Sequence, residues 1–474
     1  MNMKKMAGLL LAASIAAGLS ACGGQDGNDT GSTTADAGQT TVARSGTEPA
    51  METTSGRGET VELTFWHSMD SVFAEITEKQ IRLFNETVGK EKGIRVTGVF
   101  QNWPGTDALT AAMSTDDIAN MPDVIQLYGE SVSIVRDYDR TVWAEDYISG
   151  ADATLKKEDL IPNTVASHSI DGKMVGVPWG ISALMLYYNQ DYLEQIGSEV
   201  PRTIDEMAKI LPELVATTDA EYGLNVRINE FELENWIATQ GTDGTYFGNN
   251  ESGHAGYMTE LACDKNDSLK KFLDEWEKVV KSGAYKPIRD SINEEFAQGM
   301  HGMVIMTSSR IPTIAGLVDG SFEWGVAPIP VVDAADVGGA YPSGSGLFML
   351  DRDNEASKAA AWEFVQFMAS PEAQVMWLEG AGYIPVNLRT AELDEYKAAI
   401  AAESRLQVPY DTLMMATEKV VPAYVPNSST TDSVIKDAMI AFGEGSATKD
   451  ETFQAIVEGC ERAFADYYRA NPIN

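Results

Sequence analysis

The chain has 474 residues, and its 35 basic and 71 acidic side chains give a formal net charge of −36. Hydrophobic residues make up 44 % of the sequence, which is typical of a folded protein and more than a disordered chain carries. The acidic surplus argues against a nucleic-acid partner and against direct adhesion to anionic lipid, since both need a basic face. The 3 cysteines are too few for a disulfide scaffold or a four-cysteine zinc site. Small-molecule binding or catalysis therefore remains, and the length predicts two or more domains.

The N-terminus has the features of an export signal. A basic start is followed by an apolar run over residues 6–21, which is shorter than a membrane span. The run leads into the sequence Leu-Ser-Ala-Cys, which resembles the bacterial lipobox, where small residues fit the signal peptidase and the cysteine thiol takes a lipid. We expect residues 1–21 to be a lipoprotein signal peptide and Cys22 to be lipidated. The alternative is an ordinary cleaved signal followed by an incidental cysteine.

The composition of residues 22–60 predicts a disordered tether that starts at the lipidated Cys22. They are rich in Gly, Ser, Thr, Asp and Ala and nearly devoid of large apolar side chains, so they cannot bury enough surface to fold. A flexible coil of this length spans roughly 35 Å between its ends. The other two cysteines, Cys263 and Cys460, either pair in an oxidising exterior or stay as buried thiols, and the sequence decides for neither.

The first part of the body alternates strands and helices. Residues 61–66 alternate in polarity, as a strand with one buried face does. The next segments predict a helix from Phe73 to Phe84, a strand over 94–100, a helix from Leu109 to Ile118 and a strand over 123–128. This order predicts a parallel α/β sheet.

In such sheets, ligands bind beyond the carboxyl ends of the strands. The polar and aromatic residues at these ends are Trp66, His67 and Ser68 after the first strand, and Tyr128 and Glu130 after the third. Trp103 lies in a turn, where burying a tryptophan is awkward, so it is a further candidate. The alternatives are that Trp66 fills the core and that Glu130 is one more surface carboxylate.

The rest of the chain predicts a second region reached by extended crossings. Residues 173–189 are an extended stretch too long for one strand, so we expect it to cross between domains. The further predicted elements are helices over 201–217, 232–240 and 267–281, a short helix and turn before a strand over 302–306, an extended crossing over 324–330, a strand over 346–350, and helices over 355–379, 431–444 and 450–470. The sequence contains no internal repeat.

Seven short stretches occur in the same order as in the extracellular solute-binding proteins of bacterial ABC importers. The chain therefore resembles the sugar-carrying type of that family, and most of all the branch with the glycerol-3-phosphate and maltose binders. The stretches are Phe65–Met69, Pro122–Val124, Leu186–Asn189, Leu233–Asn235, Trp324–Pro330, Ser370–Gln374 and Gly382–Pro385.

This resemblance implies an α/β, two-lobed periplasmic-binding-protein fold of type II, in which each lobe is a mixed sheet flanked by helices. The N-terminal lobe is expected over 61–182 plus 328–398 and the C-terminal lobe over 183–327 plus 399–474. Solute would be held between the lobes and delivered to the membrane permease of an ABC importer. The resemblance further implies an exported monomer that needs no cofactor or metal. It would be anchored to the cell membrane by its lipid alone and would face the periplasm or the cell exterior.

A sugar site needs flat aromatics against C–H faces and side chains that both donate and accept hydrogen bonds. Besides the strand-end residues, the resemblance assigns ligand contacts to Trp179, Ser182, Ser308, Ser309, Gly344, Tyr383, Tyr424 and Asn427. Ser308 and Ser309 equally suit the cap of a following helix.

Departures from the family pattern bear on the solute. The glycerol-3-phosphate binders use an arginine in the late loop, yet residues 421–433 contain no Lys or Arg. Their two tryptophans before Leu-Glu-Asn are replaced here by Arg227 and Glu230. Burying a phosphate without a cation is costly, so a neutral sugar or oligosaccharide is the better expectation, with these two side chains clamping hydroxyls. Arg227 could instead serve a phosphate, which leaves a glycerol-3-phosphate or glycerophosphodiester binder as the alternative.

A secreted carbohydrate-active hydrolase is the second alternative. The four histidines at 67, 168, 254 and 301 lie too far apart for a local metal motif, and no H-E-x-x-H occurs. The sequence over 180–184 lacks the closing glycine of a nucleophile elbow. With 71 acids a glycosidase pair could always be chosen, so their number carries no weight. We therefore expect no catalysis.

Overall fold

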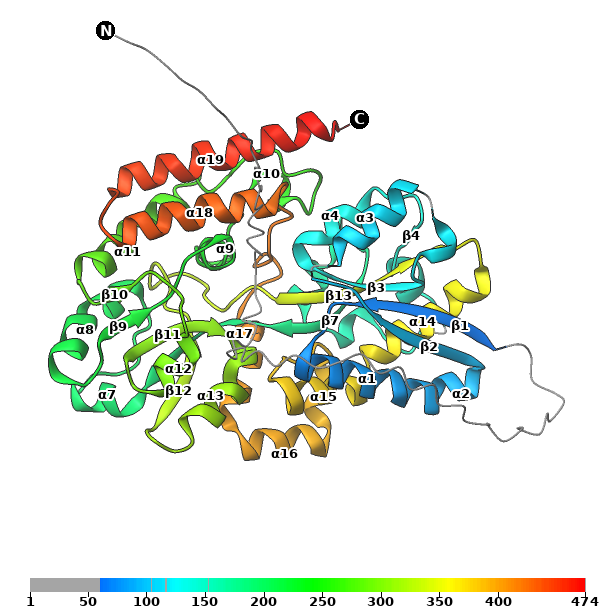
Figure 1. Cartoon of the computed structure of the whole chain (residues 1–474), viewed down its shortest axis with the longest axis horizontal. Helices are drawn as coiled ribbons and strands as arrows, with labels where there is room; N and C mark the ends of the chain where they lie inside the picture. Colours follow the sequence, from blue (N-terminus) through cyan, green and yellow to red (C-terminus); the bar gives the residue numbers. More distant parts are fainter. Residues whose placement is uncertain (1–59, 104, 116, 152, 474) are drawn as a thin grey trace, which may run out of the picture. The chain divides into compact units, whose positions relative to one another are not determined.

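The computed structural model describes residues 60–473 except positions 104, 116 and 152, and it leaves the side chain of Glu130 undescribed. The predicted signal peptide, Cys22 and nearly all of the tether lie outside the described residues. Within them the fold is mixed α/β, with a six-stranded and a five-stranded sheet flanked by helices, as predicted (Figure 1). No helix of the described part is both long and apolar enough to span a membrane.

The six-stranded sheet contains the three strands predicted near the N-terminus. Strands β2 and β3 run parallel to β1, while β13 runs antiparallel to β3, β4 and β7, so the sheet is mixed. In β1, Leu63, Phe65 and His67 are buried and the residues between them are more exposed, which is the alternation that predicted the strand. The strands are β1 (Val61–His67), β2 (Ile94–Phe100), β3 (Val124–Tyr128), β4 (Thr141–Val142), β7 (Val177–Ser182) and β13 (Ser343–Leu350).

Helices and short turns accompany this sheet. They are α1 (Ser71–Glu86), α2 (Val88–Lys92), α3 (Thr106–Thr115), η1 (Ile118–Asn120), η2 (Gly129–Ser131), α4 (Val132–Arg136), α5 (Glu145–Ile148), η3 (Lys157–Asp159), α6 (Pro162–Ala166), α14 (Glu355–Met368) and α15 (Pro371–Ala381), with a hairpin of β5 (Ser169–Ile170) and β6 (Lys173–Met174). The expected helix through Ile118 is wrong in its end, because α3 stops at Thr115 and Ile118 begins a separate 3-10 turn.

The single helix predicted over 355–379 is also wrong. It is two helices, because α14 ends at Met368 and α15 begins at Pro371. Proline has no backbone N–H and suits the first turn of a helix. Ser370 caps the new helix by accepting a hydrogen bond from the Ala373 amide at 3.3 Å. The apolar spacing continues across this break, which is why it read as one helix.

The five-stranded sheet has the order β10-β9-β11-β8-β12. Its strands are β8 (Leu184–Asn189), β9 (Tyr222–Asn225), β10 (Tyr285–Lys286), β11 (His301–Thr307) and β12 (Trp324–Pro328). The remaining helices and turns are α7 (Gln190–Gln195), α8 (Ile204–Thr217), α9 (Glu230–Ala238), α10 (Asn249–Ser252), α11 (Ser268–Lys281), α12 (Ile292–Ala297), η4 (Ser308–Arg310), α13 (Ile311–Val318), η5 (Leu388–Glu392), α16 (Asp394–Ala402), η6 (Ser404–Leu406), α17 (Gln407–Met415), α18 (Ser428–Gly443) and α19 (Lys449–Ala470). Cys263 and Cys460 are free thiols buried in the apolar core of this region.

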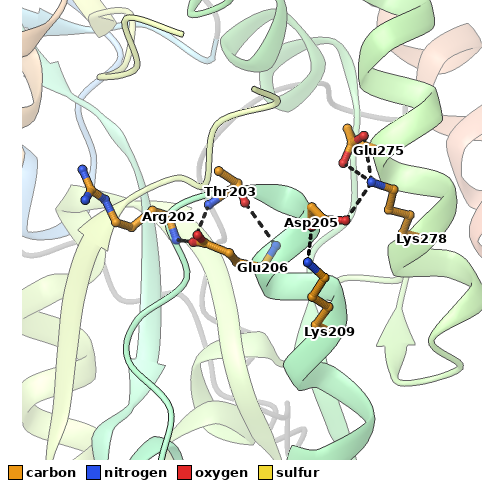
Figure 2. Close-up of polar contacts among 7 residues, drawn as sticks. All are labelled: Arg202, Thr203, Asp205, Glu206, Lys209, Glu275 and Lys278. Atoms are coloured by element: carbon orange, nitrogen blue, oxygen red, sulfur yellow. Dashed lines mark hydrogen bonds and ion pairs between the residues drawn. The ribbon is translucent and has the colours of Figure 1, made fainter. Parts of the chain in front are cut away.

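Helix α8 shows how local sequence sets a helix start (Figure 2). The Thr203 hydroxyl accepts from the Glu206 amide at 3.1 Å, and the Glu206 carboxylate accepts from the Thr203 amide at 3.3 Å. This reciprocal capping box satisfies two backbone donors that the first turn leaves open. Asp205, in the same turn, forms an ion pair with Lys278 of α11 at 2.7 Å, which joins the two helices at the surface.

The extended stretch over 173–189 passes from one sheet to the other. β7 belongs to the six-stranded sheet and β8 to the five-stranded sheet, and Ala183 is the single residue between them. The other expected crossing, 324–330, contributes β12 to the five-stranded sheet. One apolar core contains Trp179 before Ala183 and Met185 after it, so packing continues across the junction. The division into two lobes that move as separate bodies, with the boundaries given above, stays a prediction.

Gly344 is a position of close approach between β13 and β7. It has a φ of +134°, and a Cβ atom there would lie 2.0 Å from the carbonyl oxygen of Gly180. Because that neighbour is backbone, it cannot swing away. We expect Gly344→Ala to lower the free energy of unfolding by about 2–4 kcal/mol, measured by urea denaturation. Gly316→Ala, in α13 with open space around it, is the control and should be neutral or stabilising by up to about 1 kcal/mol. Equal effects of the two changes would contradict this explanation.

His168 should make stability depend on pH. It is fully buried beside Phe348, and burial lowers its pKa from 6.5 to about 4. The unfolded chain therefore takes up this proton first, so the stabilisation is complete above pH 6.5 and is lost as the pH falls towards 4. We expect the native chain to lose up to about 3 kcal/mol more than His168→Gln over this interval. Urea titrations of both chains at several pH values measure the difference. The prediction is wrong if both chains lose the same free energy of unfolding over this interval.

Candidate functional site

Four predicted contact residues from separate segments meet at the junction of β7 and β8. The Ala183 amide donates to the Ser308 hydroxyl at 3.2 Å, and the Ser308 amide donates to the Ala183 carbonyl at 2.8 Å. The Ser182 hydroxyl donates to the carbonyl of Ser343 at 3.4 Å, next to Gly344. The structure thus brings Ser182, Ser308 and Gly344 together.

Tyr383 joins the same junction. The Ile384 amide donates to the Ile181 carbonyl at 2.7 Å, which fixes the 382–385 segment against β7. The Tyr383 ring packs against Phe73 and Trp377, with centroids 5.0 and 5.1 Å away, and its burial raises its pKa. Its position agrees with a role at the junction, while its ring is held by core aromatics.

Buried polar atoms without a hydrogen-bond partner lie at the ends of β1 and β3 and on the start of β13. Among the described residues they are Nδ1 of His67, the hydroxyls of Ser68 and Ser345, and Nε2 of Gln126. The Ser68 amide donates to Oε1 of Gln126 at 2.8 Å, and Ser345 lies opposite Tyr128 in the sheet. Burial lowers the pKa of His67 to about 4, so its ring is neutral near pH 7. Buried polar groups normally find partners, so this set can hold a hydroxylated solute.

Two aromatic candidates flank this polar set. The Trp103 and Tyr128 rings meet edge to face, with centroids 3.9 Å apart. A Cβ atom on Gly105, in the same turn as Trp103, would lie 2.9 Å from the Ser68 hydroxyl. The turn with Trp103 therefore lies directly against the carboxyl ends of β1 and β3.

Two other tryptophans are placed differently. Trp66 packs against the core that contains Leu127, which is the alternative stated for it. Trp179 is fully buried, 5.0 Å from the ring of Trp377, a placement that favours a role in the core. The side chain of Glu130 lies outside the described part.

Helix α9 carries Glu230, and Arg227 precedes it. Glu230, Glu232 and Glu234 are all buried. Burial raises the pKa of Glu232, while the charges of Arg289 and Arg227 act in the opposite direction. The printed ion pair of Glu232 is with Arg289 at 3.9 Å, whereas the buried Nε of Arg227 has no hydrogen-bond partner among the described residues.

The late loop is attached to both regions of the chain. Glu234 accepts from the Ala423 amide at 3.2 Å, and the Tyr424 hydroxyl donates to the Ser167 carbonyl at 2.8 Å. Asn427 precedes α18 with a φ of +54°, and its side chain accepts from the Thr430 hydroxyl. Ser309 pairs with the Thr307 hydroxyl at 2.9 Å. For Asn427 and Ser309 the structure thus shows local contacts at helix starts.

A cavity of about 160 Å³ lies on α4, α19 and the late loop, and Tyr424 is the predicted residue that lines it. It is separate from the set of polar atoms at the strand ends. A second cavity, of about 260 Å³, is lined by Thr154, Gln366 and Arg389 and contains none of the predicted residues. In the described part no group of three His, Cys, Asp or Glu residues could hold a metal ion.

Sequence reasoning missed Gln126 and Ser345. Gln126 interrupts the apolar run of β3, and an uncharged polar residue at a buried strand position was a usable signal. Ser345 lies in a Ser-Gly-Ser-Gly stretch of which only the glycine was chosen. Glu234 and His254 were also missed as supports of the late loop, because their partners are distant in sequence.

The chain is similar to known proteins in sequence and in fold. Residues 81–404 match the profile of the bacterial extracellular solute-binding protein family. The sn-glycerol-3-phosphate-binding periplasmic protein UgpB of Agrobacterium fabrum is 22 % identical over 343 residues, which are 70 % of this chain and 75 % of that protein. The sugar-binding protein MalE of Xanthomonas citri has a TM-score of 0.71 at 18 % identity, over 87 % of this chain and 100 % of that one. UgpB of Mycobacterium tuberculosis, solved with glycerophosphocholine, has a TM-score of 0.66 at 18 % identity, over 87 % and 99 % of the two chains.

The distant structural relatives share the fold, and the family profile spans most of the described residues. The chain belongs to the bacterial extracellular solute-binding protein family.

Proposed function

We propose that this protein captures a neutral sugar or oligosaccharide and delivers it unaltered to the permease of an ABC importer. The observation that carries the proposal is the set of unpartnered polar atoms of His67, Ser68, Gln126 and Ser345 near the ends of β1 and β3 and at the start of β13. Hydroxyl groups both donate and accept, so a sugar can satisfy all four atoms. Trp103 and Tyr128 supply aromatic surface beside them.

Charge favours a neutral solute. The late loop over 421–433 has no Lys or Arg, and the chain carries a net charge of −36. Arg227 is a cation that could serve a phosphate, because its buried Nε has no hydrogen-bond partner among the described residues. A glycerol-3-phosphate or glycerophosphodiester ligand is kept as the second candidate, because UgpB proteins of Agrobacterium fabrum and Mycobacterium tuberculosis are among the relatives.

Solute is proposed to draw the two sheets together about the junction at Ala183. Ser182 and Ser345 belong to the six-stranded side, while Ser308 follows β11 of the five-stranded side. A solute that contacts both sides stabilises the arrangement in which both can touch it. Small-angle scattering should then report a smaller radius of gyration at saturating solute.

The site can be tested with Ser345→Val. The substitution removes this buried hydroxyl and so deletes one partner for a solute hydroxyl. In a thermal-shift screen, the native chain at a hundredfold excess over Kd should gain about 2.7 kcal/mol from a sugar, and the variant should gain much less. Thr97→Val, at an exposed position of β2 in the same sheet, is the matched control and should bind normally.

Three outcomes would count against this proposal. Stabilisation by glycerol phosphates and not by sugars would select the second candidate. Equal sugar stabilisation of the native chain and Ser345→Val would place the site elsewhere. If chromatography shows a hydrolysis product after incubation with a sugar, the protein is a carbohydrate-active hydrolase and not a binding protein.

Anchoring by lipid at Cys22 is proposed as well. The sequence that ends in Leu-Ser-Ala-Cys carries this proposal. Cys22→Ser should abolish incorporation of labelled palmitate in cells and move the protein from the membrane to the soluble fraction. Cys263→Ala, which alters a buried thiol, is the control and should keep both properties. Labelling that survives Cys22→Ser would refute the anchor.

A further inference from the structure

The cavity of about 160 Å³ has an unusual lining. Its lining includes the charged pair Arg136 and Asp137, four tyrosines (Tyr257, Tyr424, Tyr467 and Tyr468), and Asn471, Pro472 and Ile473 after α19. This volume is small for a ligand site, so it suits at most one ring-sized guest. Only Tyr424 belongs to the residues predicted to contact solute.

The charge of this cavity is already compensated. The Arg136 guanidinium lies over the Tyr257 ring, 3.8 Å from its centroid, and its Nη1 donates to the Gly256 carbonyl at 3.0 Å. Its Nε lies 3.4 Å from a carboxylate oxygen of Asp137. A stacked and paired arginine offers little attraction to a free anion, so phosphate or carboxylate guests are disfavoured.

The tyrosines offer ring faces and oxygen acceptors. The rings of Tyr467 and Tyr468 are nearly perpendicular, with centroids 5.2 Å apart. The rings of Tyr257 and Tyr468 are also nearly perpendicular, with centroids 6.4 Å apart. The Tyr468 hydroxyl donates to the Met258 carbonyl at 2.7 Å, and the Tyr424 hydroxyl donates to that of Ser167. Their hydrogens are used, but each oxygen keeps a lone pair that can accept from a hydroxyl.

We propose that this cavity is a second binding site, which takes a single neutral sugar ring or a polyol of that size. Aromatic faces suit the C–H surface of such a guest, and the phenol oxygens suit its hydroxyls. The site is distinct from the polar set around Ser345, so it goes beyond the proposed function and does not depend on it.

The elements around the cavity give its occupancy a consequence. Helix α4 follows β3 of the six-stranded sheet, whereas α19 packs on α18 and α11 beside the five-stranded sheet. A guest in contact with both stabilises the arrangement seen here. The second site therefore holds the two regions together when it is occupied.

Fluorine NMR of the purified chain with 3-fluorotyrosine tests the proposal. Resonances of Tyr467 and Tyr468 are assigned from Tyr467→Phe and Tyr468→Phe, and D-glucose and maltose are titrated into the millimolar range. We expect a saturable shift of at least one of these resonances. Tyr467→Ala should weaken the apparent affinity about tenfold, because a stacking face is lost, while Tyr467→Phe should stay within about threefold.

The main-site variant separates the two proposals. In Ser345→Val a saturable shift should persist, even though binding at the strand ends is lost. A shift that disappears in Ser345→Val would mean that the tyrosines merely report the other site, which would overturn the second site. The absence of a saturable shift with either sugar, or equal affinities of Tyr467→Ala and the native chain, would overturn it as well.

Discussion

The backbone bracket between Ala183 and Ser308 is the interaction on which the rest of the structure depends. Ala183 is the one residue between strands of different sheets, and Ser308 binds both its amide and its carbonyl. The Ser308 hydroxyl also reaches the Gly382 carbonyl at 3.5 Å. Three segments that are far apart in sequence are thereby fixed at one point. The Ser182 hydroxyl bond to the Ser343 carbonyl and the Ile384 amide bond to the Ile181 carbonyl hold the other predicted contacts beside it.

The polar groups next to this junction lower the stability of the fold. A buried polar atom without a partner costs about 1–3 kcal/mol, and several such atoms lie together at the ends of β1 and β3. An apolar residue at 345 would remove one of these atoms, whereas Leu at 126 would leave the Ser68 amide without its acceptor, Oε1 of Gln126. The sheet tolerates this cost because the apolar core on either side, with Phe65 and Leu127 as fully buried members, is large. Such a local cost is reasonable where a solute relieves it.

Periodicity in the sequence predicted most helices and strands, but not which side chains contact each other. The alternation in β1 and the long extended stretch through Ala183 follow from local rules, and both were predicted. The break at Ser370-Pro371 was missed although its signal, a cap followed by proline, was present. That Ser345 faces Tyr128 depends on an antiparallel strand that joins the sheet from more than 200 residues away, and no local pattern encodes such pairing. Family resemblance, not periodicity, supplied Ser182, Ser308, Gly344 and Tyr383.

The late loop (residues 421–433) has hydrogen bonds to both regions of the chain. His254 places Nδ1 3.1 Å from the Ser169 carbonyl and Nε2 2.8 Å from the Pro422 carbonyl. Burial lowers the pKa of His254, so the ring is neutral near pH 7 and has one N–H for two acceptors. One of the two carbonyls is therefore left without a hydrogen bond from this ring. The loop is held by Glu234 on one side and by contacts to Ser167 and Ser169 on the other, so a shift of either region changes the surroundings of Tyr424. A solute that moves the two sheets relative to each other must therefore also alter the tyrosine-lined cavity.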